Sequence, residues 1–191
     1  LDNGERGFSY MQDAPLDMRM SQDDSFTAWE VVNTYSEKEL VNIIKTYGEE
    51  KWARQIARVI CDRRKEAPIE TTSELVRIID ASIPKKFRAK DGSHPARRTF
   101  QALRIDVNSE FEVLYSFLDK LPGVLKSGGR VAVLTFHSGE DRLVKKAFRQ
   151  HLREGVYSEI AADAIRPSAE ECFRNPRAKS TKMRWAIRSD L

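Results

Sequence analysis

A histidine follows an apolar run at a position where open α/β sheets hold their ligands. The run Val131–Phe136 (VAVLTF) is followed directly by His137. Glu140 and Asp141 follow three and four residues after this histidine. Ligands of open α/β sheets lie beyond the carboxyl ends of the strands, so these side chains could bind a ligand or transfer protons. A structural interpretation is also open, in which Ser138 caps the next helix and the acids favour its positive end.

Several other chemistries lack their motifs. The sequence contains no G-x-S-x-G elbow of a serine hydrolase, no P-loop and no G-x-G-x-x-G turn. The 3 histidines are dispersed, and Cys61 and Cys172 lie far from each other and from other potential metal ligands. We therefore expect no metal site and two reduced, structural thiols.

Basic residues are concentrated in two blocks. Residues 85–104 hold seven bases against one acid, and residues 174–188 hold six bases and no acid, although the net charge is only +4. Such blocks indicate a polyanionic partner, and the adjacent Arg97 and Arg98 could bind its phosphates. Phe8, close to Arg6 in a glycine-containing loop, could stack on an unpaired base or pack against the core.

Helices must position the first basic block. Apolar residues at helical spacing predict four short helices between residues 24 and 83, and capping boxes at Ser36–Glu39 and Thr71–Glu74 open two of them. A longer helix follows Pro95, with apolar positions as far as Leu121, and a break could occur near Asn108. These elements form a small orthogonal bundle and a helix leading out of it.

The rest of the chain reads as an α/β unit. A turn at Gly128–Gly129, the run at 131–136 and a helix over 140–153 predict a strand buried on both faces of a parallel sheet, with a helix packed on it. Short strands are predicted near 162–165 and 183–187, with a helical turn from Ser168 between them. No apolar stretch approaches the ~18 residues of a membrane span, and we expect a cytoplasmic protein without membrane contact.

Four long stretches, in this order, resemble the small-subunit rRNA cytosine-N4 methyltransferases known as MraW or RsmH. The stretches are ERGFSYMQDAPLDMRM (5–20), SHPARRTFQALRIDVNSE (93–110), LKSGGRVAVLTFHSGEDRLVKKAF (125–148) and RPSAEECFRNPRAKSTKMR (166–184). The resemblance covers essentially the whole chain. Its one small departure is Gly139, where the family usually has a larger residue.

The resemblance implies an α/β fold: a partial class I, Rossmann-like methyltransferase sheet interrupted by a small all-α helical domain. Residues 1–21 would belong to the methyltransferase domain, residues 22–92 to the inserted helical domain on the substrate side, and residues 93–191 to the C-terminal part of the methyltransferase domain. The implied reaction transfers a methyl group from S-adenosylmethionine to N4 of a cytosine in small-subunit (16S) ribosomal RNA. The partner would be this RNA or the 30S subunit.

The resemblance also implies a missing half. Family members begin with a half-domain whose glycine-rich loop binds the cofactor, and the family pattern places that half before Leu1. We therefore expect no cofactor-binding residue in this chain, weak or absent binding of S-adenosylmethionine, and no activity of the chain alone. The strand at 131–136 would lack a neighbour on one side, so we also expect an exposed sheet edge through which the chain could self-associate.

The remaining residues are candidates for contacts with RNA and with the target base, and no catalytic residue is assigned among them. They are Arg6, Phe8, Arg19, His94, Arg97, Arg98, Gln101, Arg104, His137, Asn175, Arg177 and Lys182. The alternative function is that of a non-catalytic RNA-binding or assembly module, which a chain without the cofactor half would also fit.

Overall fold

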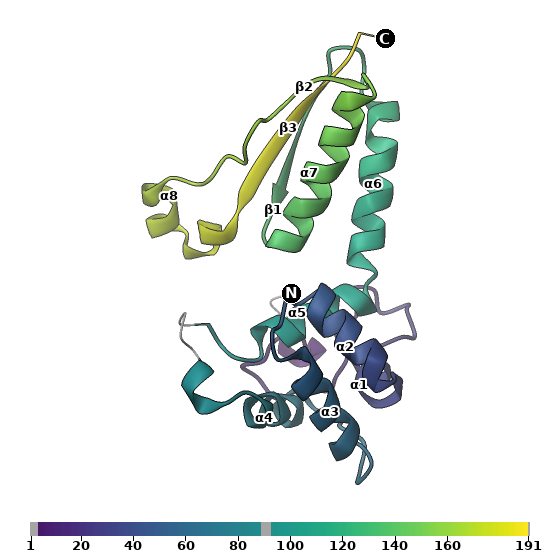
Figure 1. The fold of residues 1–191 in the computed structure, drawn as a ribbon, viewed down its shortest axis with the longest axis vertical. Coiled ribbons are helices and arrows are strands. Elements are labelled where there is room, and N and C mark those ends of the chain that lie inside the picture. The colour runs from purple at the N-terminus through teal and green to yellow at the C-terminus, as the bar shows by residue number, and fades with distance from the viewer. Residues whose placement is uncertain (1–3, 89–92, 191) are drawn as a thin grey trace. The chain divides into compact units, whose positions relative to one another are not determined.

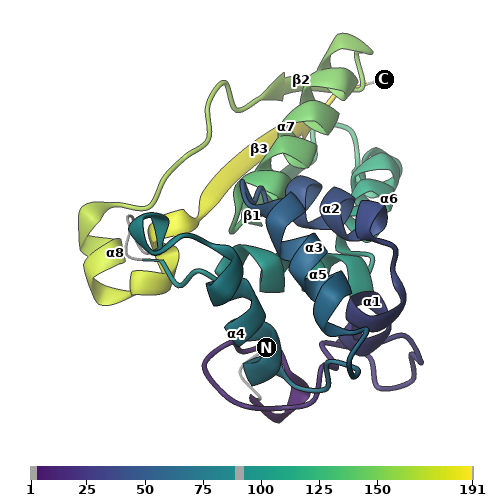
Figure 2. The same ribbon diagram turned by 60° about the horizontal axis from the view of Figure 1, so that its bottom comes forward.

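The chain forms two compact units. The computed structural model describes residues 4–88 and 93–190. Leu1–Glu110 form the helical unit, and Phe111–Leu191 form the sheet unit. Figure 1 draws the helical unit in purple to teal and the sheet unit in teal-green to yellow, and Figure 2 shows the same ribbons from a second direction.

The helical unit confirms the predicted run of short helices. Its elements are η1 (Gly4–Arg6), α1 (Ala28–Thr34), α2 (Glu37–Thr46), α3 (Ala53–Arg63), α4 (Thr72–Ser82), η2 (Lys85–Phe87) and α5 (Arg97–Val107). Ser36 and Thr71 cap α2 and α4 through the predicted capping boxes, and Thr27 caps α1 in the same way. Each box satisfies two backbone donors that a helix start leaves unpaired, so local sequence fixes these three starts.

Helices α1 to α5 contribute to one core. The sequence predicts a start near Glu49 for the third helix, but α3 begins at Ala53, because Glu49 has a positive φ of 51° and breaks the helical path. The apolar faces of α1 to α5 bury a common set of aliphatic side chains. This set includes Val32, Leu40, Ile44, Ile56, Ile60, Leu75, Ile79 and Leu103, each 0% exposed.

A segment without regular secondary structure, residues 14–18, runs through this core. Leu16 and Met18 are 2% and 0% exposed. The backbone of this segment bonds to the start of α1, where Trp29 N donates to Leu16 O at 2.8 Å, and to the start of α4, where Thr72 N donates to Ala14 O at 2.9 Å. Buried backbone groups must find such partners, and neighbouring helices supply them here.

Thr72 fixes the segment a second time through its side chain. Its Oγ1 accepts a hydrogen bond from Ala14 N at 3.0 Å and donates one to Gln12 O at 2.7 Å. Thr72 is 0% exposed, so water cannot replace these bonds.

The break predicted near Asn108 is confirmed. α5 ends at Val107, Ser109 has a positive φ of 48°, and α6 (Glu110–Val124) begins directly afterwards. Asn108 Nδ2 donates to Met18 O at 2.8 Å, which ties the break to the buried segment.

The sheet unit contains a three-stranded antiparallel sheet of order β1-β3-β2. Besides α6, its elements are β1 (Arg130–Thr135), α7 (Ser138–Arg153), β2 (Tyr157–Ile160), α8 (Ala169–Arg174), η3 (Pro176–Ser180) and β3 (Lys182–Arg188). β1 and β2 are each antiparallel to β3 and hence parallel to one another, with α7 as the connection between them. The turn before β1 is confirmed, with Gly128 at φ 69°.

The sequence predicted a parallel strand buried on both faces at 131–136, and the observed sheet shows that this prediction is wrong. β1 pairs antiparallel with β3, and its burial alternates along the strand. Val131 and Val133 pack in a core with Val144 and Phe148 of α7, whereas Leu134, on the opposite face, is 57% exposed. The apolar composition of the run predicts that both faces are covered by other elements. Among the described residues only the face with Val131 and Val133 is covered, by α7.

β1 also has a free edge among residues 4–88 and 93–190, where β3 is its one paired neighbour. The exposed edge expected from the sequence is therefore present in this part of the chain. Phe136, directly after β1, is 55% exposed. Self-association through this edge stays a prediction.

The predicted strand at 162–165 is wrong. The second strand lies at Tyr157–Ile160, and Ile165 forms only an isolated bridge with Met183. Tyr157 anchors β2 because it is 1% exposed and packs edge-on against Phe148, a contact across the fold that no local pattern reveals. In the described ranges no helix is long and apolar enough to cross a bilayer.

We expect Thr72→Val to lower the free energy of unfolding of the helical unit by about 1–3 kcal/mol, because it keeps the side-chain shape and leaves the buried Ala14 N–H unpaired. Urea denaturation followed by circular dichroism measures the change. Thr46→Val is the matched control, since Thr46 is exposed. Equal effects of the two substitutions would contradict a special role for Thr72.

Candidate functional site

The predicted site residues are distributed over both units. Arg6, Phe8, Arg19, His94, Arg97, Arg98, Gln101 and Arg104 belong to the helical unit, and His137, Asn175, Arg177 and Lys182 belong to the sheet unit.

Two candidates on α5 hold the turn between α2 and α3. Arg98 Nη1 donates to Glu49 O at 2.7 Å, and Gln101 Nε2 donates to Tyr47 O at 3.0 Å. Gly48 permits this close approach, because a Cβ at that position would lie 2.5 Å from Arg98 O. These bonds use only part of each side chain, and Arg98 remains exposed.

The other two candidates on α5 differ in their surroundings. Arg104 forms a two-pronged ion pair with Glu110, with Nε–Oε1 and Nη2–Oε2 distances of 2.7 and 3.1 Å. Its charge is therefore balanced within the protein, which makes it a weaker candidate for phosphate contacts than its neighbours. Arg97, at the start of the helix, is exposed.

His94 is held just before α5 by two contacts. Its ring stacks on Tyr10 with centroids 4.6 Å apart, and its Nδ1 accepts a hydrogen bond from Ala96 N at 3.1 Å. Tyr10 in turn meets the edge of Phe100, which is buried in the core. The N-terminal loop thereby fixes the entry to α5.

Arg6 and Arg19 shape the loop that precedes α1. The Arg6 guanidinium lies 5.5 Å from the centre of the Phe8 ring and donates to the backbone carbonyl of Met20 at 2.8 Å. Arg19 pairs with Asp17 at 2.7 Å, and its hydrogen bond holds the pKa of the Asp17 carboxyl below its ordinary value against the opposing effect of burial. Phe8 packs against the core while staying partly exposed.

In the sheet unit, His137 caps α7. Its Nδ1 accepts a hydrogen bond from Glu140 N at 3.4 Å, and Glu140 Oε2 accepts one from Phe136 N at 2.8 Å. The interpretation that Ser138 caps this helix is therefore wrong, because the helix begins one residue earlier than that interpretation requires. Glu140 supports the helix start, as the structural interpretation expected.

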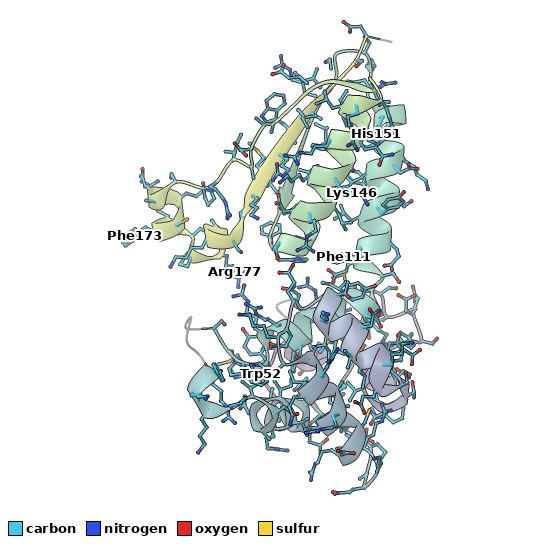
Figure 3. The ribbon with its side chains drawn as sticks, viewed as in Figure 1. Trp52, Phe111, Lys146, His151, Phe173 and Arg177 are labelled. Atoms are coloured by element: carbon cyan, nitrogen blue, oxygen red, sulfur yellow. The ribbon has the colours of Figure 1, made fainter. Side chains whose placement is uncertain are left out.

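Phe111 explains the glycine at position 139. Its ring tip lies 2.6 Å from the point where a Cβ on Gly139 would stand, so a larger residue there would collide with the ring. The ring also lies 5.9 Å from the His137 ring, and Figure 3 labels Phe111 at the start of α6. An aromatic side chain from another helix thus fills the space beside Gly139.

Lys182 belongs to a buried charge cluster that the sequence did not reveal. Asp141 on α7 pairs with Arg184 at 2.8 Å and with Lys182 at 3.3 Å, and the Asp141 and Arg184 side chains are each 10% exposed. Burial opposes ionisation of Asp141, but hydrogen bonds and charges of Arg184 and then Lys182 outweigh it and lower the pKa of Asp141. The cluster clamps α7 onto β3.

Asn175 and Arg177 lie in the connection from α8 to β3. Asn175 Oδ1 accepts a hydrogen bond from Arg177 N at 3.2 Å and so caps η3. Figure 3 shows Arg177 and the neighbouring Phe173, which is 87% exposed, in this segment. The sequence analysis did not propose Phe173, Trp52 or Phe87 as RNA-contact residues. Phe87 lies among lysines and arginines in the sequence, and this pattern could have indicated it.

The fold defines a mixed α/β protein with helices packed on a small antiparallel sheet. A family model described as the MraW methylase family matches residues 1–189, and the chain belongs to that family. The resemblance seen in the four sequence stretches is thereby confirmed.

Relatives in this family are rRNA methyltransferases by name. The chain is 50% identical over 193 residues to ribosomal RNA small subunit methyltransferase H 1 of Lachnoclostridium phytofermentans, with 99% of this chain and 53% of the relative covered. It is 49% identical over 201 residues to ribosomal RNA small subunit methyltransferase H of Clostridioides difficile, with 97% and 64% covered. The chain thus spans between half and two thirds of the length of these relatives.

The described residues do not fit a cradle for S-adenosylmethionine. Rossmann-like sheets hold a nucleotide with a glycine-rich turn after a strand and an acidic residue on the ribose. Here Gly128 and Gly129 precede β1, at the opposite end from His137. Asp141 is engaged by its cationic partners and Glu140 by a backbone N–H, so neither carboxylate is presented to a ribose.

We expect Asp141→Asn to lower the free energy of unfolding of the sheet unit by about 3–5 kcal/mol at pH 7, because two cations lose their buried counter-charge. A lowered folded pKa gives stability that is present above the ordinary value of 3.8 and is lost as pH falls through the folded value. The deficit of the variant should therefore shrink below pH 3.8. Hydrogen exchange of β3 amides in urea measures it.

Asp119→Asn is the matched control, since Asp119 is exposed on α6 and should change stability little at either pH. A deficit of Asp141→Asn that stays constant down to pH 2 would contradict the assigned ion pair.

Proposed function

We propose that this chain forms the RNA-binding part of an S-adenosylmethionine-dependent methyltransferase that modifies N4 of a cytosine in small-subunit ribosomal RNA. The observation that carries the proposal is the family match over residues 1–189, together with the names of relatives at 48–50% identity. The substrate would be this RNA, free or within the 30S subunit, and the site of action the cytoplasm.

The sheet unit supports a place at one side of a larger Rossmann-like sheet. β1 has a free edge, and its face with Ala132 and Leu134 is apolar and exposed among the described residues. Strands and helices of a further half would cover both. The division proposed from the sequence, with residues 1–21 and 93–191 in the methyltransferase domain and 22–92 inserted into it, stays a proposal. The compact units divide differently, because the segment at 14–18 and α5 pack in one core with α1 to α4.

The chemistry of N4 methylation sets the task of the residues in this chain. In the proposed enzyme, S-adenosylmethionine would be bound outside this chain and would supply the methyl group. A cytosine amine must be held in line with that group, and its base must leave the stack to get there. Binding and orienting the RNA is the part that the exposed arginines of α5 and the aromatic side chains of the helical unit could perform.

We expect the 191-residue chain alone to transfer no methyl group, and a chimera to do so. In the chimera, this chain is fused to the part of the Lachnoclostridium relative that lies outside the matched residues. Transfer of a radiolabelled methyl group to unmethylated 30S subunits measures activity, and nucleoside mass spectrometry identifies the product. Calorimetric titration with S-adenosylmethionine, on the chain and on the chimera, locates the cofactor site.

The full-length relative is the positive control. Activity of the chain alone at the rate of the relative would contradict the placement of the cofactor site. A chimera that binds both cofactor and 30S subunits but methylates an atom other than cytosine N4 would contradict the assigned reaction. A chimera that binds 30S subunits without the cofactor and methylates nothing would favour the assembly module.

A further inference from the structure

A hollow of about 300 Å³ opens on the helical unit between the start of α3, η2 and the entry to α5. Two of the predicted RNA-contact residues, His94 and Arg98, line it. Its remaining lining residues were not singled out from the sequence, and they combine three kinds of side chain that a nucleotide needs. They include Glu50, Lys51, Trp52, Phe87 and Arg88.

Aromatic rings form one part of the lining. The Trp52 and Phe87 rings lie 5.4 Å apart at an angle of 43°, and Phe87 is 42% exposed. Figure 3 labels Trp52 in the helical unit. Trp52 is half-buried and Phe87 is exposed. Aromatic rings that line a hollow offer a stacking surface for a base, and such stacking is insensitive to which base is bound.

A buried carboxylate forms the second part. Glu50 is 8% exposed, and its Oε1 accepts a hydrogen bond from Trp52 N at 2.9 Å. An ionised carboxylate only accepts hydrogen bonds, and it has more acceptor positions than this one bond uses. Glutamate accepts a hydrogen bond from the exocyclic amine of cytosine, whereas uracil presents a carbonyl oxygen at the same place.

Cations that are fixed by backbone carbonyls form the third part. Arg98 is held by Glu49 O, and Arg88 Nε donates to Ile83 O at 2.8 Å. Lys86 Nζ lies 5.0 Å from the centre of the Phe87 ring, and Lys51 is exposed at the hollow. Because Arg88 and Arg98 are already oriented, phosphates of a bound strand could pair with them at little entropic cost.

We propose that this hollow binds one unpaired cytosine of a single RNA strand. The base stacks on Trp52 and Phe87, its amine donates to Glu50, and the flanking phosphates lie near Arg88 and Arg98. The proposal rests on the proposed function, since it takes small-subunit ribosomal RNA as the partner.

The test is binding of fluorescein-labelled oligocytidylate and oligouridylate, each ten nucleotides long, to the 191-residue chain by fluorescence anisotropy. We expect tighter binding of oligocytidylate, and we expect Phe87→Ala to weaken it by about 5- to 150-fold. Phe117→Ala is the matched control, because Phe117 of α6 is 49% exposed and lies outside the hollow. It should leave the affinity within about twofold.

Glu50→Gln tests the base recognition separately. A glutamine amide both donates and accepts, so the preference for oligocytidylate over oligouridylate should fall to about one or reverse. Glu37→Gln, an exposed acid on α2, should keep the preference. Circular dichroism melting of each variant confirms that it is folded. If Trp52→Ala loses affinity for oligocytidylate, Trp52→Phe should retain most of it, because it keeps an aromatic ring.

A folded Phe87→Ala variant that binds oligocytidylate as the unchanged chain does would overturn the assigned hollow. An unchanged base preference in Glu50→Gln would overturn the assigned role of that carboxylate. Failure of the proposed function is distinguished by a separate result. In that case the chimera would leave 30S subunits unmethylated, whether or not the chain binds these oligonucleotides.

Discussion

Hydrogen bonds from the buried segment at residues 14–18 tie together parts of the helical unit that are distant in sequence. The backbone of this segment bonds to the starts of α1 and α4, and Asn108 reaches its end from the break after α5. Without these partners the segment could not be buried, since unpaired backbone groups are costly in a core. The same chain continues back to Tyr10, whose ring fixes His94. The entry to α5, and with it one wall of the hollow, therefore depends on this segment.

The basic residues fall into two groups, those paired with an acid inside the protein and those whose charge is available to a bound polyanion. Arg19, Arg104 and Arg184 are each paired with an acid, and their charges hold loops, helices and strands in place. Arg98 and Arg88 are instead anchored by neutral carbonyls, so they keep their net charge while being oriented. A polyanion would be attracted chiefly by the second kind, because in the described part of the chain these two arginines bond to carbonyl oxygens rather than to carboxylates.

Local signals made much of the helical unit predictable, and contacts across the fold explain most of the remainder. The capping boxes at Ser36 and Thr71 and the break at Asn108 are sequence-local, and they were located correctly. β2 was misplaced because its anchor, Tyr157, is defined by packing on Phe148. The same holds for the site: residue types suggested RNA contacts, but the hollow joins Glu50, Trp52 and Phe87 across a gap in sequence that no motif spans. The family assignment came from long motifs rather than from these contacts.

Cross-linking would test most directly the central claim that the helical unit binds unpaired ribosomal RNA. The 191-residue chain would be irradiated with ultraviolet light in the presence of 30S subunits, and mass spectrometry would locate peptides that carry nucleotides. We expect adducts on the peptides that contain Trp52, Phe87 and His94, and competition by oligocytidylate should remove them. Adducts confined to the sheet unit, or adducts on the helical unit that oligocytidylate leaves unchanged, would contradict the claim.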